Sequence, residues 1–239
     1  MESFGTVDGP GIRFVLFLQG CPLRCLYCHN PDTWGYQDGN EMSVDEVVNQ
    51  ILKYKTYIKN GGVTISGGEP LVQIDFVTEL LKKLKQHNLH TAIDTSGFFY
   101  TEANRKKYDR LMEFCDLVLL DLKHIDQQKH VALTSVSNEN TLNFANYLSD
   151  TQKPVWIRHV LVPGYSDDVE DLIRLRQFIE TLNNVEKIEI LPYHTMGVNK
   201  YQQLNLDYKL TGVQPPTKAS IQQATEIVVK GNYEESYSH

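Results

Sequence analysis

Six short runs of apolar residues recur along the chain, and a stretch with helical periodicity follows each of them. The first two runs are "RFVLFLQ" at 13–19 and "GVTISG" at 62–67. Such nearly continuous apolar runs are typical of parallel strands that are buried on both faces, whereas half-exposed strands alternate. The other predicted strands cover residues 90–97, 116–123, 154–162 and 185–194.

The segments between these strands have the periodicity and the end signals of helices. In "SVDEVVNQILKYKTYIKN" at 43–60, Ser43 and Glu46 form the signature of a capping box. Alternation of strands and helices predicts right-handed βαβ units and an α/β fold, either as part of a barrel or as an open doubly wound sheet. The other predicted helical stretches lie at about 72–87, 102–114, 126–149, 167–183 and 217–230.

The 239 residues show no internal linker, repeat or low-complexity segment, so a single domain over 1–239 is expected. The tail from about 231 to 239, which contains "NYEESYSH", is expected to be frayed and disordered.

The charge balance excludes some partners. With a formal net charge of −7, the chain lacks the basic face that binding to nucleic acid requires. Two basic clusters, "KKLKQH" at 82–87 and "RKK" at 105–107, fall in predicted helices and are interpreted as solvated helix faces. No nucleic-acid partner is therefore expected.

The hydropathy of the chain predicts no association with a membrane. No apolar run approaches the roughly 20 residues that span a bilayer, and the N-terminus has no signal-peptide pattern. A cytoplasmic location is expected, in a reducing compartment. Clustered cysteines in such a compartment indicate a metal or redox site rather than disulfides.

Polar and glycine-rich segments follow each predicted strand at its carboxyl end. The carboxyl ends of parallel strands meet on one edge of the sheet, where α/β proteins bind their ligands. The six segments are therefore expected to form one functional site. In chain order they are the cysteine-rich stretch, "SGGEP", "DTSG", "DLKH", Arg158 within its strand, and "PYHTMG".

Three of the four cysteines lie at spacing C-x3-C-x2-C, as Cys21, Cys25 and Cys28. Thiolates bind zinc, copper and iron–sulfur clusters. A zinc site would need a fourth ligand, for which the adjacent His29 is the candidate, although zinc ligands usually come as two separated pairs. Cys115 lies at the opposite end of its strand from the other signals and is expected to be an inert packed thiol.

Three thiolates on a [4Fe–4S] cluster leave one iron without a protein ligand. An open coordination position is where a substrate or cofactor can bind and react. The spacing therefore indicates either such an open cluster or a non-catalytic metal-binding module that uses the three cysteines and His29.

The cysteine motif and "GGEP" at 67–70 resemble those of radical S-adenosylmethionine (SAM) enzymes, in which an aromatic residue such as Tyr27 precedes the last cysteine. The resemblance implies a partial (β/α)6 TIM-like barrel and two cofactors, a [4Fe–4S] cluster and SAM. It also implies that the amino and carboxylate groups of SAM chelate the open iron. Reductive cleavage of SAM would then give methionine and a 5′-deoxyadenosyl radical.

A closer resemblance covers nearly the whole chain. The family of activases that install the radical of glycyl radical enzymes, in particular of pyruvate formate-lyase, is similar in "SFGTVDGPGIRFVLFLQGCPLRCLYCHNPDTW", "VPGYSDD" and "LPYHTMG". It implies abstraction of a glycine Cα hydrogen from pyruvate formate-lyase in anaerobic glucose metabolism. A flavodoxin or ferredoxin would be the electron donor, and a monomer is expected. A different glycyl radical enzyme remains the alternative substrate.

Relatives with other substrates often carry an inserted ferredoxin-like domain with several more cysteines. Cys115 is the only cysteine to spare in this chain, which disfavours that subgroup.

The resemblance also implies residues that contact SAM. Gly67 and Gly68 lack Cβ atoms and allow a close backbone approach. Glu69 either contacts SAM or orients the loop, and Tyr27 packs beside the cluster unless it is a plain surface aromatic. Three cations are placed near SAM, although His194 would otherwise be a packing residue: Lys123, Arg158 and His194.

Asp94 and Asp121 end neighbouring strands, so their carboxylates should lie close together and repel unless a cation or a shared proton intervenes. The resemblance implies a monovalent cation, Na⁺ or K⁺, bound by both aspartates and by the carbonyls of Thr95 and Leu119. The alternative is two independently solvated carboxylates.

The turn "GTVDGPGIR" at 5–13 precedes the first predicted strand. Its Asp-Gly-Pro-Gly sequence is turn chemistry, and Asp8 would form an Asx-turn there. The resemblance places Asp8 near the glycine loop of the bound substrate.

Overall fold

The computed structural model of the chain describes residues 1–37 and 39–233, within which seven strands form one sheet. Strands β2 to β7 are parallel and β1 is antiparallel to β2. In the order of the sequence and of the sheet the strands are β1 (Glu2–Gly5), β2 (Arg13–Leu18), β3 (Gly62–Gly67), β4 (Thr91–Thr95), β5 (Leu117–Asp121), β6 (Val155–Leu161) and β7 (Val185–Pro192).

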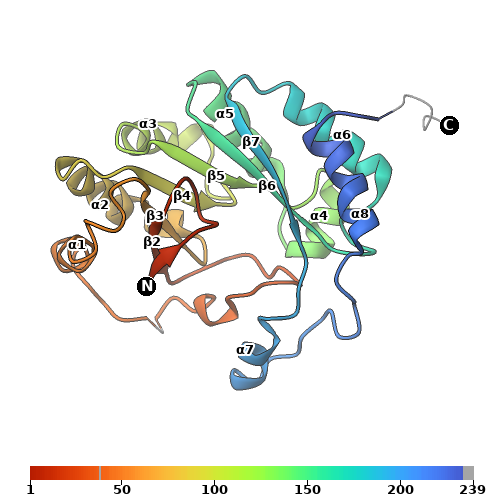
Figure 1. Cartoon of the computed structure of the whole chain (residues 1–239), viewed down its shortest axis with the longest axis horizontal. Coiled ribbons are helices and arrows are strands. Elements are labelled where there is room, and N and C mark those ends of the chain that lie inside the picture. Colours follow the sequence, from red (N-terminus) through yellow and green to blue (C-terminus); the bar gives the residue numbers. More distant parts are fainter. Residues whose placement is uncertain (38, 234–239) are drawn as a thin grey trace.

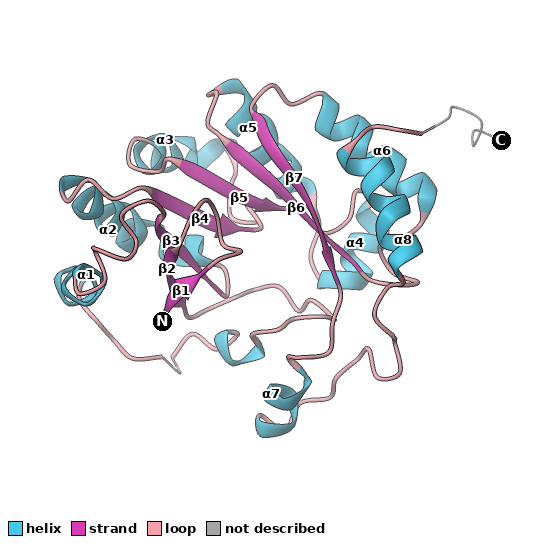
Figure 2. Ribbon diagram, viewed as in Figure 1, coloured by secondary structure: helices cyan, strands magenta, loops and turns pink. Residues whose placement is uncertain are grey.

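This strand order decides between the two predicted architectures. A doubly wound sheet reverses its strand order at a switch point, whereas a barrel adds each strand beside the previous one. The six parallel strands follow one another without reversal, which confirms the prediction of a partial barrel. Figures 1 and 2 show the sheet as a curved surface.

Helices cover the outer side of this surface, and α7 lies apart from the others beyond the end of β7 (Figure 1). Among the described residues, no helix is long and apolar enough to cross a membrane. The helices are α1 (Val44–Leu52), α2 (Ile74–Gln86), α3 (Arg105–Met112), α4 (Gln127–Thr134), α5 (Glu139–Asp150), α6 (Val169–Glu180), α7 (Val198–Gln203) and α8 (Lys218–Ala224).

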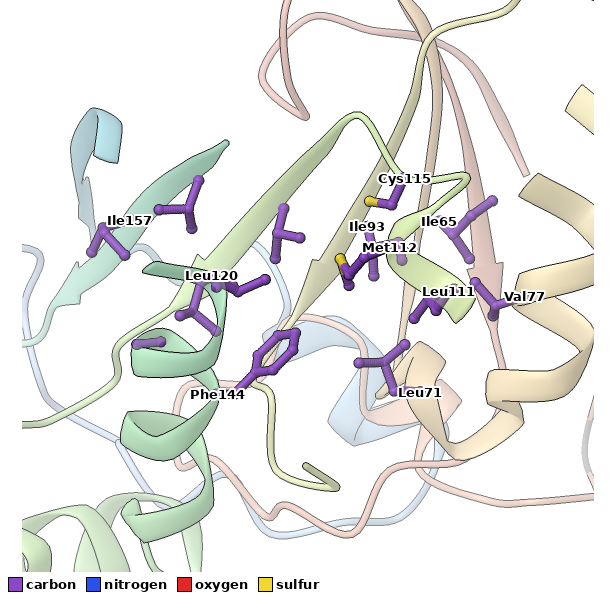
Figure 3. Packing of buried hydrophobic residues seen from close by; sticks show 14 of the residues in the cluster. Ile65, Leu71, Val77, Ile93, Leu111, Met112, Cys115, Leu120, Phe144 and Ile157 are labelled. Carbon is purple, nitrogen blue, oxygen red and sulfur yellow. The ribbon is translucent and has the colours of Figure 1, made fainter. Parts of the chain in front are cut away.

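The core lies between the sheet and these helices. Ile65, Ile93 and Leu120 come from three neighbouring strands and pack against Leu111 of α3 and Phe144 of α5 (Figure 3). All five side chains are buried. Because successive side chains of a strand point to opposite faces, the intervening residues face the concave side of the sheet. Toward the carboxyl ends of the strands these residues are polar, such as Ser66, Asp94 and Asp121, and they line the site.

The helix boundaries differ from the predictions in ways that the local sequence explains. The capping box of Ser43 and Glu46 is present, but α1 ends at Leu52 instead of residue 60. Tyr, Thr and Ile in the following stretch are poorer helix formers, and the chain continues in turns such as Tyr57 N to Tyr54 O. The helical stretches predicted between about 126 and 149 are α4 and α5, and α4 ends at Ser135, whose φ of 68° is left-handed.

Two elements have no counterpart in the predictions. β1 and α7 contain 4 and 6 residues, which is too short for a periodic signal. At the C-terminal end, α8 passes into one π-helical turn at Thr225–Val229, where Lys230 N donates to Thr225 O. Residues 231–233 of the predicted frayed tail are in neither helix nor strand, and 234–239 lie outside the described residues.

Candidate active site

The three cysteines of the C-x3-C-x2-C motif line one cavity of about 430 Å³ at the carboxyl ends of the strands. Cys21 and Cys25 are buried, and Cys28 is half-buried. Burial raises the pKa of the Cys21 thiol to about 11 and that of Cys25 to about 12. These thiols therefore stay protonated near neutral pH unless a metal centre supplies positive charge, in which case a coordinating thiol loses its proton.

Backbone hydrogen bonds fix the cysteine loop from two sides. Arg24 N donates to Thr134 O at 2.8 Å and Leu26 N donates to Leu133 O at 3.0 Å, both in the last turn of α4. On the other side, Glu69 N donates to Gly20 O at 2.8 Å. The loop is thus attached to the end of α4 and to the segment after β3, which holds the thiols on the cavity wall.

Glu69 is buried, and its carboxylate is surrounded by donors from the protein. Thr95 Oγ1 (2.5 Å) and Leu71 N (3.1 Å) donate to one oxygen, while Ser96 N (2.8 Å) and Ser96 Oγ (2.6 Å) donate to the other. Of the two roles that the sequence left open, this arrangement favours orientation of the loop. The carboxylate fastens the end of β3 to the end of β4.

Gly67 and Gly68 occupy positions that a side chain would obstruct. Gly67 has a φ of 124°, and a Cβ there would lie 2.2 Å from Leu18 N. A Cβ on Gly68 would lie 2.5 Å from Gly20 O. The two glycines therefore allow the segment after β3 to pass directly against the cysteine loop, and both border the cavity.

Arg158 stands between the two aspartates. Its Nη1 donates to Asp94 Oδ1 at 3.3 Å, and its Nε lies 3.7 Å from Asp121 Oδ1. Ser66 Oγ also donates to Asp94 Oδ2 at 2.7 Å. The sequence predicted that these carboxylates would repel unless a cation or a shared proton intervened. In the structure the guanidinium of Arg158 contacts both of them.

The charges of this group shift one another's titration. Burial raises the pKa of Asp94 although Arg158 opposes the rise, and Asp94 in turn raises the pKa of Arg158. For Asp121, burial is outweighed by Lys123 and Arg158, so its pKa is lowered. The guanidinium and at least one carboxylate are therefore charged at neutral pH.

Lys123 connects the aspartates with the cysteine loop. Its Nζ donates to Asp121 Oδ2 at 2.9 Å and lies 5.7 Å from the centre of the Tyr27 ring. Burial opposes its charge, but Asp121 and Tyr27 more than offset that effect and raise the pKa of Lys123. Tyr27 is 5% exposed, which excludes the alternative of a surface aromatic.

His29 and His194 stack on each other at the cavity wall, with ring centres 4.0 Å apart and planes 19° from parallel. The Nε2 atom of His29 lies 3.1 Å from His194 O. A zinc site of three cysteines and His29 would need these side chains to converge on one ion. Within residues 1–37 and 39–233, no three His, Cys, Asp or Glu side chains are arranged to hold a single metal ion.

The turn that carries Asp8 lies next to the charged group. Asp8 interacts electrostatically with Arg158 and contributes to its raised pKa, and Val7 of the same turn borders the cavity. Thr64 Oγ1 donates to Asp8 O at 2.6 Å. The turn thus approaches the site from the amino end of β2.

Two residues lie away from the cavity wall. Leu119 is buried and packs with Ala92, Leu117 and Trp156, and it does not line the cavity. Cys115 is 2% exposed, and its Sγ donates to Leu117 O at 3.2 Å at the amino end of β5. The position of Cys115 agrees with the prediction of a packed thiol.

Several wall residues were not singled out from the sequence, although most of them lie in segments in which neighbouring residues were predicted to belong to the site. The segment "DTSG" offered a signal for Ser96, because its neighbours Asp94 and Thr95 were predicted to be site residues. The unpredicted residues on the wall include Val7, Asn30, Trp34, Ser66, Ser96, Val160 and Leu191.

The residues present fit a small polar ligand and an iron–sulfur cluster. Three buried atoms at the cavity have no hydrogen-bond partner in the described protein: Tyr27 OH, Arg158 Nε and His194 Nδ1. Buried polar atoms normally find a partner, so these atoms indicate a bound group. A volume near 430 Å³ is in the usual range for small-molecule sites.

Comparison with known proteins gives concordant results. The family model of the radical SAM superfamily matches residues 15–176. The "Pyruvate formate-lyase-activating enzyme" of Staphylococcus epidermidis is 54% identical over 233 residues, which cover 95% of this chain and 93% of the relative.

Solved structures show the same fold. A domain of the pyruvate-formate lyase-activating enzyme from Bacteroides vulgatus superposes with a TM-score of 0.59 and 30% identity, over 71% of this chain and 94% of that domain. SuiB from Streptococcus suis bound to S-adenosylmethionine superposes with a TM-score of 0.69 over 93% of this chain and 48% of that protein. At 18% identity, the second comparison bears on the fold alone.

Proposed function

Because the chain belongs to the radical SAM superfamily and, within it, to the pyruvate formate-lyase-activating enzymes, we propose the following roles for its residues. The enzyme cleaves SAM to methionine and a 5′-deoxyadenosyl radical, which takes a Cα hydrogen from a glycine of pyruvate formate-lyase. The observation that carries the assignment of the site is that three thiols share one cavity with the segment after β3 and with the charged residues at the ends of β4 to β6.

Cys21, Cys25 and Cys28 are the residues that would hold the [4Fe–4S] cluster. When bound, the cluster supplies the electron for cleavage of SAM and an open iron for its amino and carboxylate groups. The backbone of Gly67 and Gly68, which borders the cavity, would contact the amino group of SAM. Glu69 keeps that backbone in place through its bonds to Leu71, Thr95 and Ser96.

The cations at the cavity are suited to the carboxylate and ribose of SAM. Lys123 and Arg158 are charged, and Arg158 Nε has no protein hydrogen-bond partner in the described chain. His194 Nδ1 is likewise unpartnered and available to the ligand. A Na⁺ or K⁺ ion bound by Asp94, Asp121 and the backbone carbonyls of Thr95 and Leu119 belongs to this proposal, and it would require Arg158 to share the carboxylates with the ion.

Asp8 is proposed to contact the glycine loop of the substrate, since its turn reaches the charged group from the amino end of β2. A deoxyadenosyl radical attacks most C–H bonds, so selectivity for one glycine has to come from positioning. The hydrogen leaves the glycine Cα with one electron of its bond, which gives 5′-deoxyadenosine and a glycyl radical.

The proposal also covers the domain organisation, the location, the oligomeric state and the electron donor of the enzyme. We assign residues 1–239 to one radical SAM domain that works as a cytoplasmic monomer, with a flavodoxin or ferredoxin as electron donor. The support is the family to which the chain belongs.

The test is anaerobic incubation of the reconstituted enzyme with SAM, a reductant and pyruvate formate-lyase deuterated at the glycine Cα. A glycyl radical in the electron paramagnetic resonance spectrum and deuterium in 5′-deoxyadenosine are expected. Radical formation with another glycyl radical enzyme but not with pyruvate formate-lyase would show that the other enzyme is the substrate. Turnover of a small metabolite without any deuterium transfer would leave only the radical SAM chemistry.

A further inference from the structure

Arg13 is the most deeply buried cation of the described chain outside the site, and nothing above gives it a role. The side chain is 0% exposed and lies on the concave side of the sheet, at the amino end of β2. Burial lowers its pKa to about 10, so it remains charged at neutral pH. A fully buried charge is costly unless it is paired and hydrogen-bonded.

The guanidinium donates to several backbone and hydroxyl oxygens, and its Nη1 also lies 3.3 Å from His90 Nδ1. Nη2 donates to Val63 O at 2.6 Å, and Nη1 donates to Gly61 O at 2.9 Å. A third contact, from Nη1 to Pro10 O at 3.3 Å, reaches the turn before β2. Arg13 therefore joins the start of β3 to the turn that contains Asp8.

A second connection runs through Thr64. Arg13 Nε donates to Thr64 Oγ1 at 2.5 Å, and the same hydroxyl donates to Asp8 O at 2.6 Å. A hydroxyl that accepts from a cation becomes a stronger donor, so the two bonds reinforce each other. Thr64 is also 0% exposed, which shields this chain of bonds from water.

The glycines of the turn make this arrangement possible. A Cβ on Gly9, which has a φ of 123°, would lie 2.9 Å from Arg13 Cδ. A Cβ on Gly11 would lie 2.5 Å from Asn60 O. The turn is thus packed directly over the arginine side chain and the chain before β3, with no room for another residue type at these two positions.

We propose that Arg13 and Thr64 are positioning residues for the protein substrate: through the Thr64 hydroxyl they hold the backbone of Asp8 and fix the 7–11 turn beside the radical site. This inference rests on the proposed function, in which that turn contacts the substrate. Neither residue lines the cavity that contains the cysteines, so they act on substrate binding and on the alignment of the glycine rather than on cleavage of SAM.

Thr64 offers the sharper test, because replacement of a fully buried arginine endangers folding. Thr64→Val keeps the shape and removes the hydroxyl, whereas Thr64→Ser keeps the hydroxyl. The matched control is Thr78→Val in α2, where a 5% exposed threonine also donates to a backbone carbonyl, Ile74 O at 2.7 Å, far from the turn. Both valine variants lose the bond from the hydroxyl to a backbone carbonyl, and Thr64→Val also loses the bond that the hydroxyl accepts from Arg13 Nε.

The measurements separate substrate positioning from general stability. Thr64→Val should raise the KM for pyruvate formate-lyase about tenfold, the usual effect of one lost hydrogen bond. Its SAM affinity, its iron content and its slow SAM cleavage without protein substrate should match the wild type. Thr64→Ser should restore the KM to within about twofold, and Thr78→Val should not change it.

Hydrogen exchange provides a readout that needs no substrate. The amides of Gly9, Gly11 and Ile12 should exchange faster in Thr64→Val than in Thr64→Ser or Thr78→Val. An unchanged KM in Thr64→Val, or an equal rise in Thr64→Ser or Thr78→Val, would overturn the inference. If wild-type enzyme formed no glycyl radical at all, the proposed function would fail instead, and hydrogen exchange would still show whether Thr64 holds the turn.

Discussion

The backbone N–H of Leu26 donates to the carbonyl oxygen of Leu133 at 3.0 Å, so the cysteine loop is bound to the last turn of α4. The final carbonyls of a helix have no partner within the helix and are usually satisfied by water or by a cap. Here the loop supplies donors for them. The position of the cluster ligands therefore depends on how α4 ends.

His130 organises that helix end and should make the stability of the protein depend on pH. It is 2% exposed, and its Nδ1 donates to Val136 O at 2.8 Å, just beyond α4. Burial lowers the pKa of His130 from 6.5 to about 4. The unfolded chain therefore takes up a proton below pH 6.5 while the folded protein does not.

Between pH 6.5 and about 4, unfolding of the protein is accompanied by proton uptake at His130, so the free energy of unfolding should fall as the pH falls. The loss due to His130 is at most about 3 kcal/mol. Thermal unfolding of the reconstituted enzyme at pH 7 and pH 5 should show a smaller difference for His130→Asn, whose amide can replace the Nδ1–H donor. Equal pH dependence in both proteins would contradict the assignment. His29, His90, His124 and His159, whose pKa values are also lowered, will leave a residual dependence.

The cysteines should divide into two classes. Replacement of Cys21, Cys25 or Cys28 by Ala should abolish cluster binding and methionine formation, because three thiolates are the minimum for a cluster with an open iron. Cys115→Ser should retain about four iron and four sulfide per chain, since its thiol lies in the core near Leu117. Anaerobic iron and sulfide analysis decides this. One zinc and no sulfide in the wild type would instead favour the non-catalytic module.

The sequence predicted the parts of this molecule whose signals are local. Buried strands are recognisable as apolar runs. Polar residues at or after the strand ends, such as Glu69, Asp94 and Asp121, indicate that one site lies at the carboxyl edge of the sheet. What the sequence did not reveal depends on contacts across the fold. The stacking of His29 on His194 joins residues 165 positions apart, and the guanidinium of Arg158 reaches both aspartates only because β4, β5 and β6 are neighbours.

Glu69 is the clearest example of a role that required the structure. Glu69→Gln replaces one acceptor oxygen with an NH2 group. That group would face either the two donors of Ser96 or the donors of Thr95 and Leu71. An unsatisfied buried group costs about 1–3 kcal/mol. The expected result is an unfolding temperature lower by several degrees and SAM affinity reduced about tenfold or more.

A surface carboxylate provides the control for this substitution. Glu46 accepts from Ser43 N and Ser43 Oγ at 2.7 Å each, in the exposed capping box of α1. Glu46→Gln should change neither SAM affinity nor, beyond a small cap effect, thermal stability. If Glu69→Gln behaved like Glu46→Gln in titrations with SAM, the carboxylate would not be holding the segment after β3.

The contact of Arg158 with Asp94 and Asp121 leads to a prediction about monovalent cations. In the proposed SAM complex, the site would gain a further carboxylate beside two aspartates, and one guanidinium could not contact all three equally well. A Na⁺ or K⁺ ion would relieve that repulsion. SAM affinity should therefore differ among sodium, potassium and a large organic cation at equal ionic strength, with the organic cation giving the weakest binding.

Asp121→Asn should weaken SAM binding and reduce the difference among salts, while iron content stays at the wild-type level. Asp167→Asn serves as the control, because Asp167 is a half-buried aspartate that accepts from Gly164 N at 2.7 Å outside the cavity. Equal SAM affinities in all three salts would show that the guanidinium of Arg158 is a sufficient counterion for both carboxylates.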